Sequence, residues 1–366
     1  MFEQVADAIE RQDYQTADQL LKHLIQQEPE NPWVQFYLAR FYEAKGKLEA
    51  AEKAYRQLLC NATHPKIVSQ ARQGIERLAE IGQKQRDQDL ALFFAEPGSH
   101  ELGVLVLEPI PPELKKTAAQ KFAQIVGLDA YSAHLQLPSR SWRLYRTGPV
   151  GELRFYTSSL RKAEIPCFCA PIREISEINV YQVNYFQSIA PQATVVYQRE
   201  QENQATLNFE WSEVSQRVEG LLPLFDDALD LDVRGKLQRK TKTADYAQWC
   251  DLHLPGRKSI LRLCDQNYDF HQGITFSANP ESAQAMGQTT ARGNWNNLIK
   301  SVNQQLPEIP IWSDFKAFAE TAIDFQEMLK HIEPHIHHLF RREKTPWDAA
   351  FELYSGLVFL DKNSDC

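Results

Sequence analysis

A spacing of 34 residues recurs at the start of the chain. Small or apolar residues are separated by this distance three times, as Ala17 and Ala51, Leu21 and Tyr55, and Leu24 and Leu58. Each block ends near a proline, and Gly46 lies where the chain must reverse between helices. A fixed period in this range is typical of stacked helical hairpins. The pattern therefore predicts paired antiparallel helices over residues 1–65.

With this period, the segment resembles the tetratricopeptide repeat (TPR). The small residue Ala39 would let paired helices approach closely, as the family requires. The first repeat departs from the pattern at Gln12, where a turn glycine is expected. A further helix predicted over 67–81 is interpreted as a partial third repeat or a cap, and the polar run 83–89 as a linker or a solvated helix extension.

The resemblance implies a concave surface that binds a peptide or a partner helix. By motif position, that surface would be lined by Phe2, Ile9, Trp33, Phe36, Arg40 and Glu43. Trp33 and Phe36 would anchor the partner through apolar contacts. Arg40 and Glu43 would fix its orientation. The alternative is that the repeats only pack on the rest of the chain, since stacked repeats usually need three or more units for stability.

Composition excludes several function classes. With 366 residues, 43% of them apolar, the chain is long for a single domain and can form more than one packed core. Its 40 Lys and Arg against 48 Asp and Glu give a net charge of −8, which disfavours a dedicated nucleic-acid binder. No apolar run approaches the ~18 residues of a membrane span, and the first residues lack a secretory signal. Together with scattered cysteines, this predicts a cytoplasmic protein with reduced thiols.

The segment 98–190 alternates between strand and helix patterns. The predicted elements are, in order, a strand over 103–107, a helix from 111 to 127, strands over 131–137 and 142–145, a helix from 148 to 163, and a strand over 167–172. The order β-α-β-β-α-β is the ferredoxin-like arrangement. It describes an architecture and carries no function by itself.

The remaining residues, 191–366, are predicted to contain further antiparallel strands and a helical C-terminus. The predicted elements include strands over 178–186, 193–199 and 205–211, a short helix that begins at Ser212, a hairpin over 246–264 with a type II turn at Pro255-Gly256, and helices after 281. The fold class is therefore α+β. The predicted domains are 1–90, 98–190 and 191–366, and the last two are either separate or one domain.

The charge changes sign abruptly between residues 200 and 243. Nine acids and one base occupy 200–232, and five bases and no acid occupy 233–243. The bases are Arg234, Lys236, Arg239, Lys240 and Lys242, and Arg257 and Lys258 would add to them if they lie nearby. This basic segment either binds an anion or is a solvated loop that neutralises the neighbouring acids.

Two clusters raise the question of catalysis or metal binding. Cys250, Asp251 and His253 are close in sequence, but on a strand Cys250 points to the opposite face from the other two. His331 and His335 have the spacing of zinc ligands on a helix, but Pro334 disturbs such a helix. We therefore predict no catalytic residue, no metal and no cofactor.

The leading hypothesis is a non-enzymatic interaction protein of the scaffold or assembly-factor type. It would bind a protein partner through the TPR-like helices. The alternative is a regulator that binds an anionic ligand, nucleic acid or a membrane surface through the basic segment 234–258. No transmembrane segment is expected, and contact with a membrane surface is left open.

Overall fold

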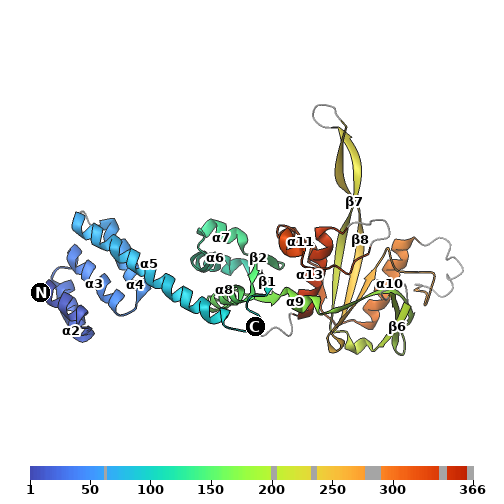
Figure 1. The fold of residues 1–366 in the computed structure, drawn as a ribbon, viewed down its shortest axis with the longest axis horizontal. Helices are drawn as coiled ribbons and strands as arrows, with labels where there is room; N and C mark the ends of the chain where they lie inside the picture. The colour runs from blue at the N-terminus through green and yellow to red at the C-terminus, as the bar shows by residue number, and fades with distance from the viewer. Residues whose placement is uncertain (62–63, 199–203, 232–236, 277–289, 338–343, 361–366) are drawn as a thin grey trace. The chain divides into compact units, whose positions relative to one another are not determined.

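The computed structural model describes residues 1–61, 64–198, 204–231, 237–276, 290–337 and 344–360, without the side chains of 226–231 and 237–241. The chain divides into two compact units, unit 1 (Met1–Leu92) and unit 2 (Phe93–Cys366) (Figure 1). Helical hairpins form the N-terminal unit, and helices and strands are mixed in the second, as the sequence predicts. Among the described residues, no helix is both long and apolar enough to cross a membrane.

Unit 1 is built from helices only. They are α1 (Phe2–Glu10), α2 (Tyr14–Gln27), α3 (Pro32–Ala44), α4 (Leu48–Asn61) and α5 (Pro65–Phe94). All six residues that recur at the 34-residue spacing are buried, and so the residues at this spacing belong to the core of unit 1. Gly46 turns the chain with φ +69°, and Gln12 adopts φ 60° at the equivalent turn. Gln12 therefore takes the left-handed conformation for which the family pattern supplies glycine.

The long helix α5 covers the second hairpin. It joins the segment predicted as a helix over 67–81 to the polar run 83–89, which is a helix extension. Ile67, Ala71 and Leu78 are buried in one cluster with Tyr55 of α4. At Gly74 a Cβ would lie 2.5 Å from the Tyr55 ring, so glycine permits this close approach of α5 to α4.

The first part of unit 2 is a small antiparallel sheet. Its strands are β1 (Leu102–Leu107), β2 (Arg143–Pro149) and β3 (Cys167–Pro171), in the order β2-β1-β3. The connecting helices are α6 (Pro112–Val126), α7 (Ala130–Gln136) and α8 (Val150–Lys162). They bury Leu105, Leu107 and Cys169 on one face of the sheet.

The ferredoxin-like order predicted for 98–190 is not confirmed, because the predicted strand 131–137 is helix α7. The Asp129 side chain accepts hydrogen bonds from the backbone N–H groups of Tyr131 and Ser132, at 3.0 and 2.9 Å, and so starts a helix. The alternation of apolar and polar residues in this segment predicts a buried apolar face. Tyr131 and Leu135 are instead 75% and 57% exposed. Three strands, rather than four, result.

A larger, seven-stranded sheet follows. Its strands are β4 (Asn179–Ser188), β5 (Ala193–Gln198), β6 (Gln204–Phe209), β7 (Gln216–Leu231), β8 (Leu237–Leu254), β9 (Ser259–Cys264) and β10 (Ile311–Trp312), in the order β10-β7-β8-β9-β4-β5-β6. The β10–β7 and β4–β9 pairs are parallel and the other pairs are antiparallel. The hairpin of β7 and β8 extends away from the rest of the sheet (Figure 1).

Two local predictions in this sheet are wrong. The helix expected to begin at Ser212 is a single 3-10 turn, Trp211–Glu213, followed by the long strand β7. The hairpin of β8 and β9 forms, but a 3-10 turn over Pro255–Arg257 replaces the type II turn, and Lys258, not Gly256, adopts the left-handed conformation at φ 48°. Long-range pairing of β7 with β8 outweighs the weak helical pattern after Ser212.

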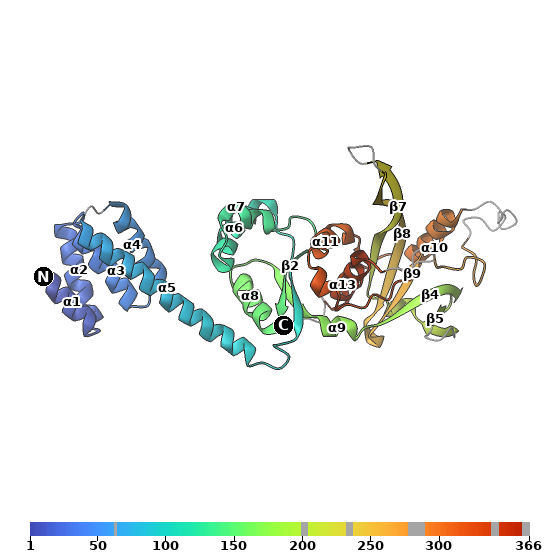
Figure 2. The same cartoon turned by 45° about the horizontal axis from the view of Figure 1, so that its top comes forward.

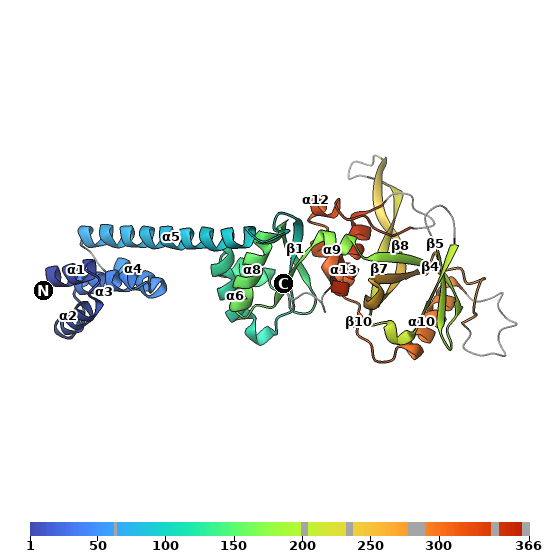
Figure 3. The same ribbon diagram turned by 60° about the horizontal axis from the view of Figure 1, so that its bottom comes forward.

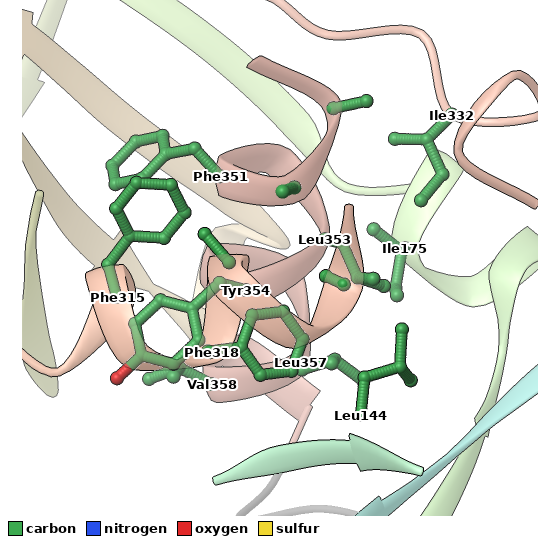
Figure 4. Packing of buried hydrophobic residues seen from close by; sticks show 14 of the residues in the cluster. Leu144, Ile175, Phe315, Phe318, Ile332, Phe351, Leu353, Tyr354, Leu357 and Val358 are labelled. Carbon is green, nitrogen blue, oxygen red and sulfur yellow. The ribbon is translucent and has the colours of Figure 1, made fainter. Parts of the chain in front are cut away.

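The C-terminal helices lie between the two sheets. They are α11 (Phe315–Ala322), α12 (Gln326–Leu329) and α13 (Pro346–Leu360), whereas α9 (Ile172–Ser176) connects β3 to β4 and α10 (Ala291–Gln305) packs on the strands in a separate cluster. Figures 2 and 3 both show α13 between the small sheet and β7. Every residue from Asp348 to Phe359 is buried, and one cluster joins α11 and α13 to both sheets (Figure 4).

A buried polar network ties α13 to the large sheet. Arg262 of β9 donates to both carboxylate oxygens of Asp251 of β8, with the shortest bonds at 2.9 and 2.7 Å, and also donates to Glu352 of α13. Ser355 of α13 donates to Asp251 at 2.6 Å and lies 3.0 Å from His253 Nε2. Every member is buried, so the charges must satisfy one another.

The protonation states follow from this geometry. Burial and then the Arg262 charge lower the pKa of His253 to about 3, so the imidazole is neutral. Because the Ser355 hydroxyl already donates to Asp251, its oxygen accepts from His253 Nε2–H. Burial alone would raise the pKa of Glu352, but Arg262 and His335 outweigh it and hold that pKa at about 2.

We expect Arg262→Met to destabilise unit 2 by about 3–5 kcal/mol, because Asp251 and Glu352 would remain buried without their cation. The measurement is urea unfolding of the full chain. Arg173→Met is the matched control, since Arg173 also pairs with two carboxylates, Glu101 and Glu177, but is exposed. Equal losses in both variants would contradict a special role for the buried network.

Candidate partner-binding surface

Half-exposed aromatic side chains form a continuous row on unit 1. The Phe2 ring of α1 stacks on Tyr37 of α3 with centroids 5.8 Å apart. The Tyr37 ring lies 6.5 Å from Trp33, and Trp33 lies 6.3 Å from His64. The Lys66 ammonium is 5.9 Å from the centre of the Trp33 ring. We call Phe2, Tyr37, Trp33 and His64 the aromatic row.

The helices hold this row in place. Trp33 and Tyr37 are four residues apart on α3 and so share one face. The start of α3 is fixed by Pro32 in its first turn and by Asn31, whose side chain accepts a hydrogen bond from the Trp33 N–H at 2.9 Å. Phe2 comes from α1, and His64 directly precedes α5. The row therefore combines residues of α1 and α3 with the residue that precedes α5.

Trp33 and Phe36, the two predicted anchors, lie in different places. Trp33 is half-buried in the row, whereas Phe36 is buried beneath it. The Phe36 ring contacts Trp33, Tyr37 and Tyr55 at centroid distances of 6.0, 5.5 and 6.2 Å. Ile9 is buried as well. Tyr37, which the sequence reasoning missed, occupies the surface position, and its spacing of four from Trp33 is the signal that marks it.

Glu43 is engaged inside unit 1. It accepts hydrogen bonds from the Tyr55 hydroxyl at 2.6 Å and from two Arg77 nitrogens at 2.9 and 3.1 Å, so it links α3, α4 and α5. Burial would raise the pKa of Glu43, but the bonds from Arg77 and Tyr55 outweigh it and lower that pKa. Arg40 is half-exposed, and among the described residues it has no carboxylate at ion-pair distance.

Three of the bases predicted to bind an anion lie on a strand that pairs with an acidic strand. Arg234 and Lys236 lie outside the described residues. Arg239, Lys240 and Lys242 belong to β8, which pairs with the acidic strand β7 in a register that places Lys242 opposite Asp226. Where the structure describes them, the end of the acidic block and the basic block are thus the neighbouring strands β7 and β8 rather than a helix and a loop.

Arg257 and Lys258, the last two bases of the set, are occupied by carboxylates. Arg257 makes a two-pronged ion pair with Glu213, at 2.6 and 2.8 Å, and Lys258 pairs with Glu177 at 2.8 Å. Both bases are therefore neutralised locally, and no observation on the described part of this segment favours an anion site.

The structure also shows where the remaining candidate catalytic and metal-binding residues lie. Cys250 faces a different cluster from Asp251 and His253, as the strand geometry predicts. Burial raises the pKa of the Cys250 thiol, which keeps it protonated. His331, His335 and His337 follow no common helix, and His338 lies outside the described residues. No group of three or more metal-binding side chains occurs among the described residues.

Comparison with known proteins gives one match. Residues 8–64 match the family model of the tetratricopeptide repeat. The N-terminal region is TPR-like. The match begins near the end of α1, extends past the end of α4, and suggests a role in protein–protein interaction or as a scaffold. No curated protein and no solved structure matches the chain.

The Glu43 network of the TPR-like unit predicts an acid-sensitive stability. We expect Glu43→Gln to destabilise unit 1 by about 1–2 kcal/mol at pH 7, because Arg77 and Tyr55 lose a charged acceptor. The folded pKa of Glu43 lies below its usual 4.5, so this stabilisation is complete above pH 4.5 and is lost as the pH falls through the folded pKa. The variant should therefore approach the wild type in acid.

Hydrogen exchange of α4 and α5 in the full chain, followed by mass spectrometry at pH 7 and at steps down to pH 3, measures this difference. Glu52→Gln is the control, because Glu52 pairs with Arg56 on the exposed face of α4. A difference between Glu43→Gln and wild type that does not shrink in acid would contradict the assigned role of the carboxylate.

Proposed function

We propose that the chain is a non-enzymatic scaffold or assembly factor that binds a segment of a protein partner on the aromatic row of unit 1. The observation that carries the proposal is the row itself. Four aromatic rings lie side by side, and three of them are only half-buried. A few residues carry most of the binding energy in protein interfaces, and Trp and Tyr are over-represented among them.

The charges beside the row define the expected partner. Arg40 lies three residues after Tyr37 on α3 and so projects from the same face of the helix. Glu43 is already neutralised by Arg77, which leaves Arg40 and Lys66 as cations near the rings. The partner segment would therefore carry apolar or aromatic residues flanked by an acidic residue.

Two observations support a non-enzymatic role. Ser355, His253 and Asp251 contain the groups of a hydrolytic triad, but all three are fully buried and anchor α13. The Ser355 hydroxyl donates to the carboxylate instead of to the imidazole, so it is not activated as a nucleophile. The cytoplasmic location expected from the sequence stays a prediction.

Site-specific photocrosslinking tests the proposal. With p-benzoylphenylalanine in place of Tyr37, irradiation in extract of the native cell should give a discrete protein adduct. The same substitution at Tyr131 is the control, because Tyr131 is 75% exposed on α7 of unit 2. Arg40→Glu should weaken binding of the captured partner by about tenfold, and this change leaves the buried core intact. The same adduct at both positions, or none at position 37, would overturn the proposal.

A further inference from the structure

Unit 2 contains a cavity of about 650 Å³ at the base of the β7–β8 hairpin. Its walls come from β7, β8, α10 and the start of α11, and the apolar part of the lining includes Leu221, Trp249, Trp295, Ile299 and Phe315. A volume of this size is typical of small-molecule sites. Figure 2 shows α10 beside the strands at the base of the hairpin.

The cavity arises where α10 stops covering the sheet. Trp295 and Leu298 of α10 pack on Cys250 and Leu252 of β8. Two strand positions further along the hairpin, Leu221 pairs with Gln248, and Pro223 pairs with Tyr246. Leu221 is 51% exposed and Tyr246 is 45% exposed. Apolar side chains thus stand uncovered at the mouth of a cavity whose lining is mixed, with Gln248, Asn296 and Asn303 beside the apolar residues.

The back wall is rigid. At Gly220 a Cβ would lie 2.5 Å from the Phe351 ring and 3.1 Å from Phe315, so aromatic side chains press against the backbone of β7 from the core. Trp249 and Phe315 are fully buried. Because these rings are fixed by packing beneath the strands, the wall that β7 and β8 form is preformed for a ligand.

The charges of the lining favour an anion. Glu219 is neutralised by Arg217 at 2.9 Å, and Arg217 also donates to Asn303 at 2.6 Å. Lys300 of α10 and Lys316 of α11 also line the cavity, and neither has an ion-pair partner among the described residues. Two ammonium groups are therefore left without a local counter-charge beside an apolar chamber.

We infer that this cavity binds a small aromatic anion, that is, a planar apolar ring system with one carboxylate, sulfonate or phosphate group. The rings would lie against the accessible side chains of Leu221, Tyr246 and Ile299, where contact with the Tyr246 ring adds to apolar burial. The acidic group would lie at the mouth, between Lys300 and Lys316. This site is separate from the aromatic row of unit 1 and does not depend on the proposed function.

Two dyes that share an anilinonaphthalene body provide the test. 1-Anilinonaphthalene-8-sulfonate is anionic, and N-phenyl-1-naphthylamine lacks the sulfonate. We expect saturable fluorescence enhancement of the anionic dye by the folded full chain. Lys300→Glu/Lys316→Glu should weaken its binding about tenfold and leave binding of the neutral dye unchanged. Both lysines are exposed, so the double variant should fold.

Two further variants test whether the loss of dye binding comes from the cavity. Lys116→Glu/Arg140→Glu makes the same change in net charge at exposed positions of unit 2 that do not line the cavity, and it should leave both dyes unaffected. Leu221→Glu places a carboxylate at the mouth and should weaken the anionic dye. The inference is overturned if the wild type shows no saturable binding, if the Lys300/Lys316 variant binds as the wild type does, or if dodecanoate displaces the dye better than 2-naphthoate.

Discussion

Unit 2 depends on the burial of one helix between two sheets. An α-helix that is buried on all sides normally carries only apolar residues, yet α13 contains Glu352 and Ser355. The cost of burying that carboxylate is offset because Arg262 of the large sheet donates to it, and Ser355 donates to Asp251 of the same sheet, while apolar residues of α13 face the small one. The polar contacts therefore fix which side of α13 faces which sheet, and the two sheets form one unit through it.

In unit 1 the sequence predicted the core better than the surface. A 34-residue period selects the residues that repeat the same packing, and these are the buried positions Ala17, Leu21 and Leu24 with their partners. Surface positions have no such constraint. One residue along a helix is a rotation of about 100°, which is enough to exchange Phe36, beneath the row, for Tyr37, within it. Glu43 shows the same limit, because its partner Arg77 lies 34 residues away.

Unit 2 shows where local patterns fail and why. Most strands follow their alternation, since a buried face selects one register. The segment 131–137 carries the same alternation, but the Asp129 cap and two exposed apolar side chains belong to a helix. After Ser212 the backbone is decided by pairing with β8, and this pairing also makes neighbours of the acidic and basic blocks. The strand after Ser212 and the pairing of the two charged blocks both depend on contacts between β7 and β8. A short window of sequence does not contain such contacts.

The cavity of unit 2 illustrates the same principle for a site. Its walls combine residues near 220, 248, 300 and 315, and none of these segments has a motif of its own. Glu219 would appear to neutralise a lysine nearby, but Arg217 already holds it through the same strand face. The charges of Arg217 and Glu219 cancel, and the excess positive charge comes from Lys300 and Lys316. The cavity gathers Lys300 of α10 and Lys316 of α11 from segments that are distant from β7 in sequence, and so the tertiary structure determines which charges are available to a ligand.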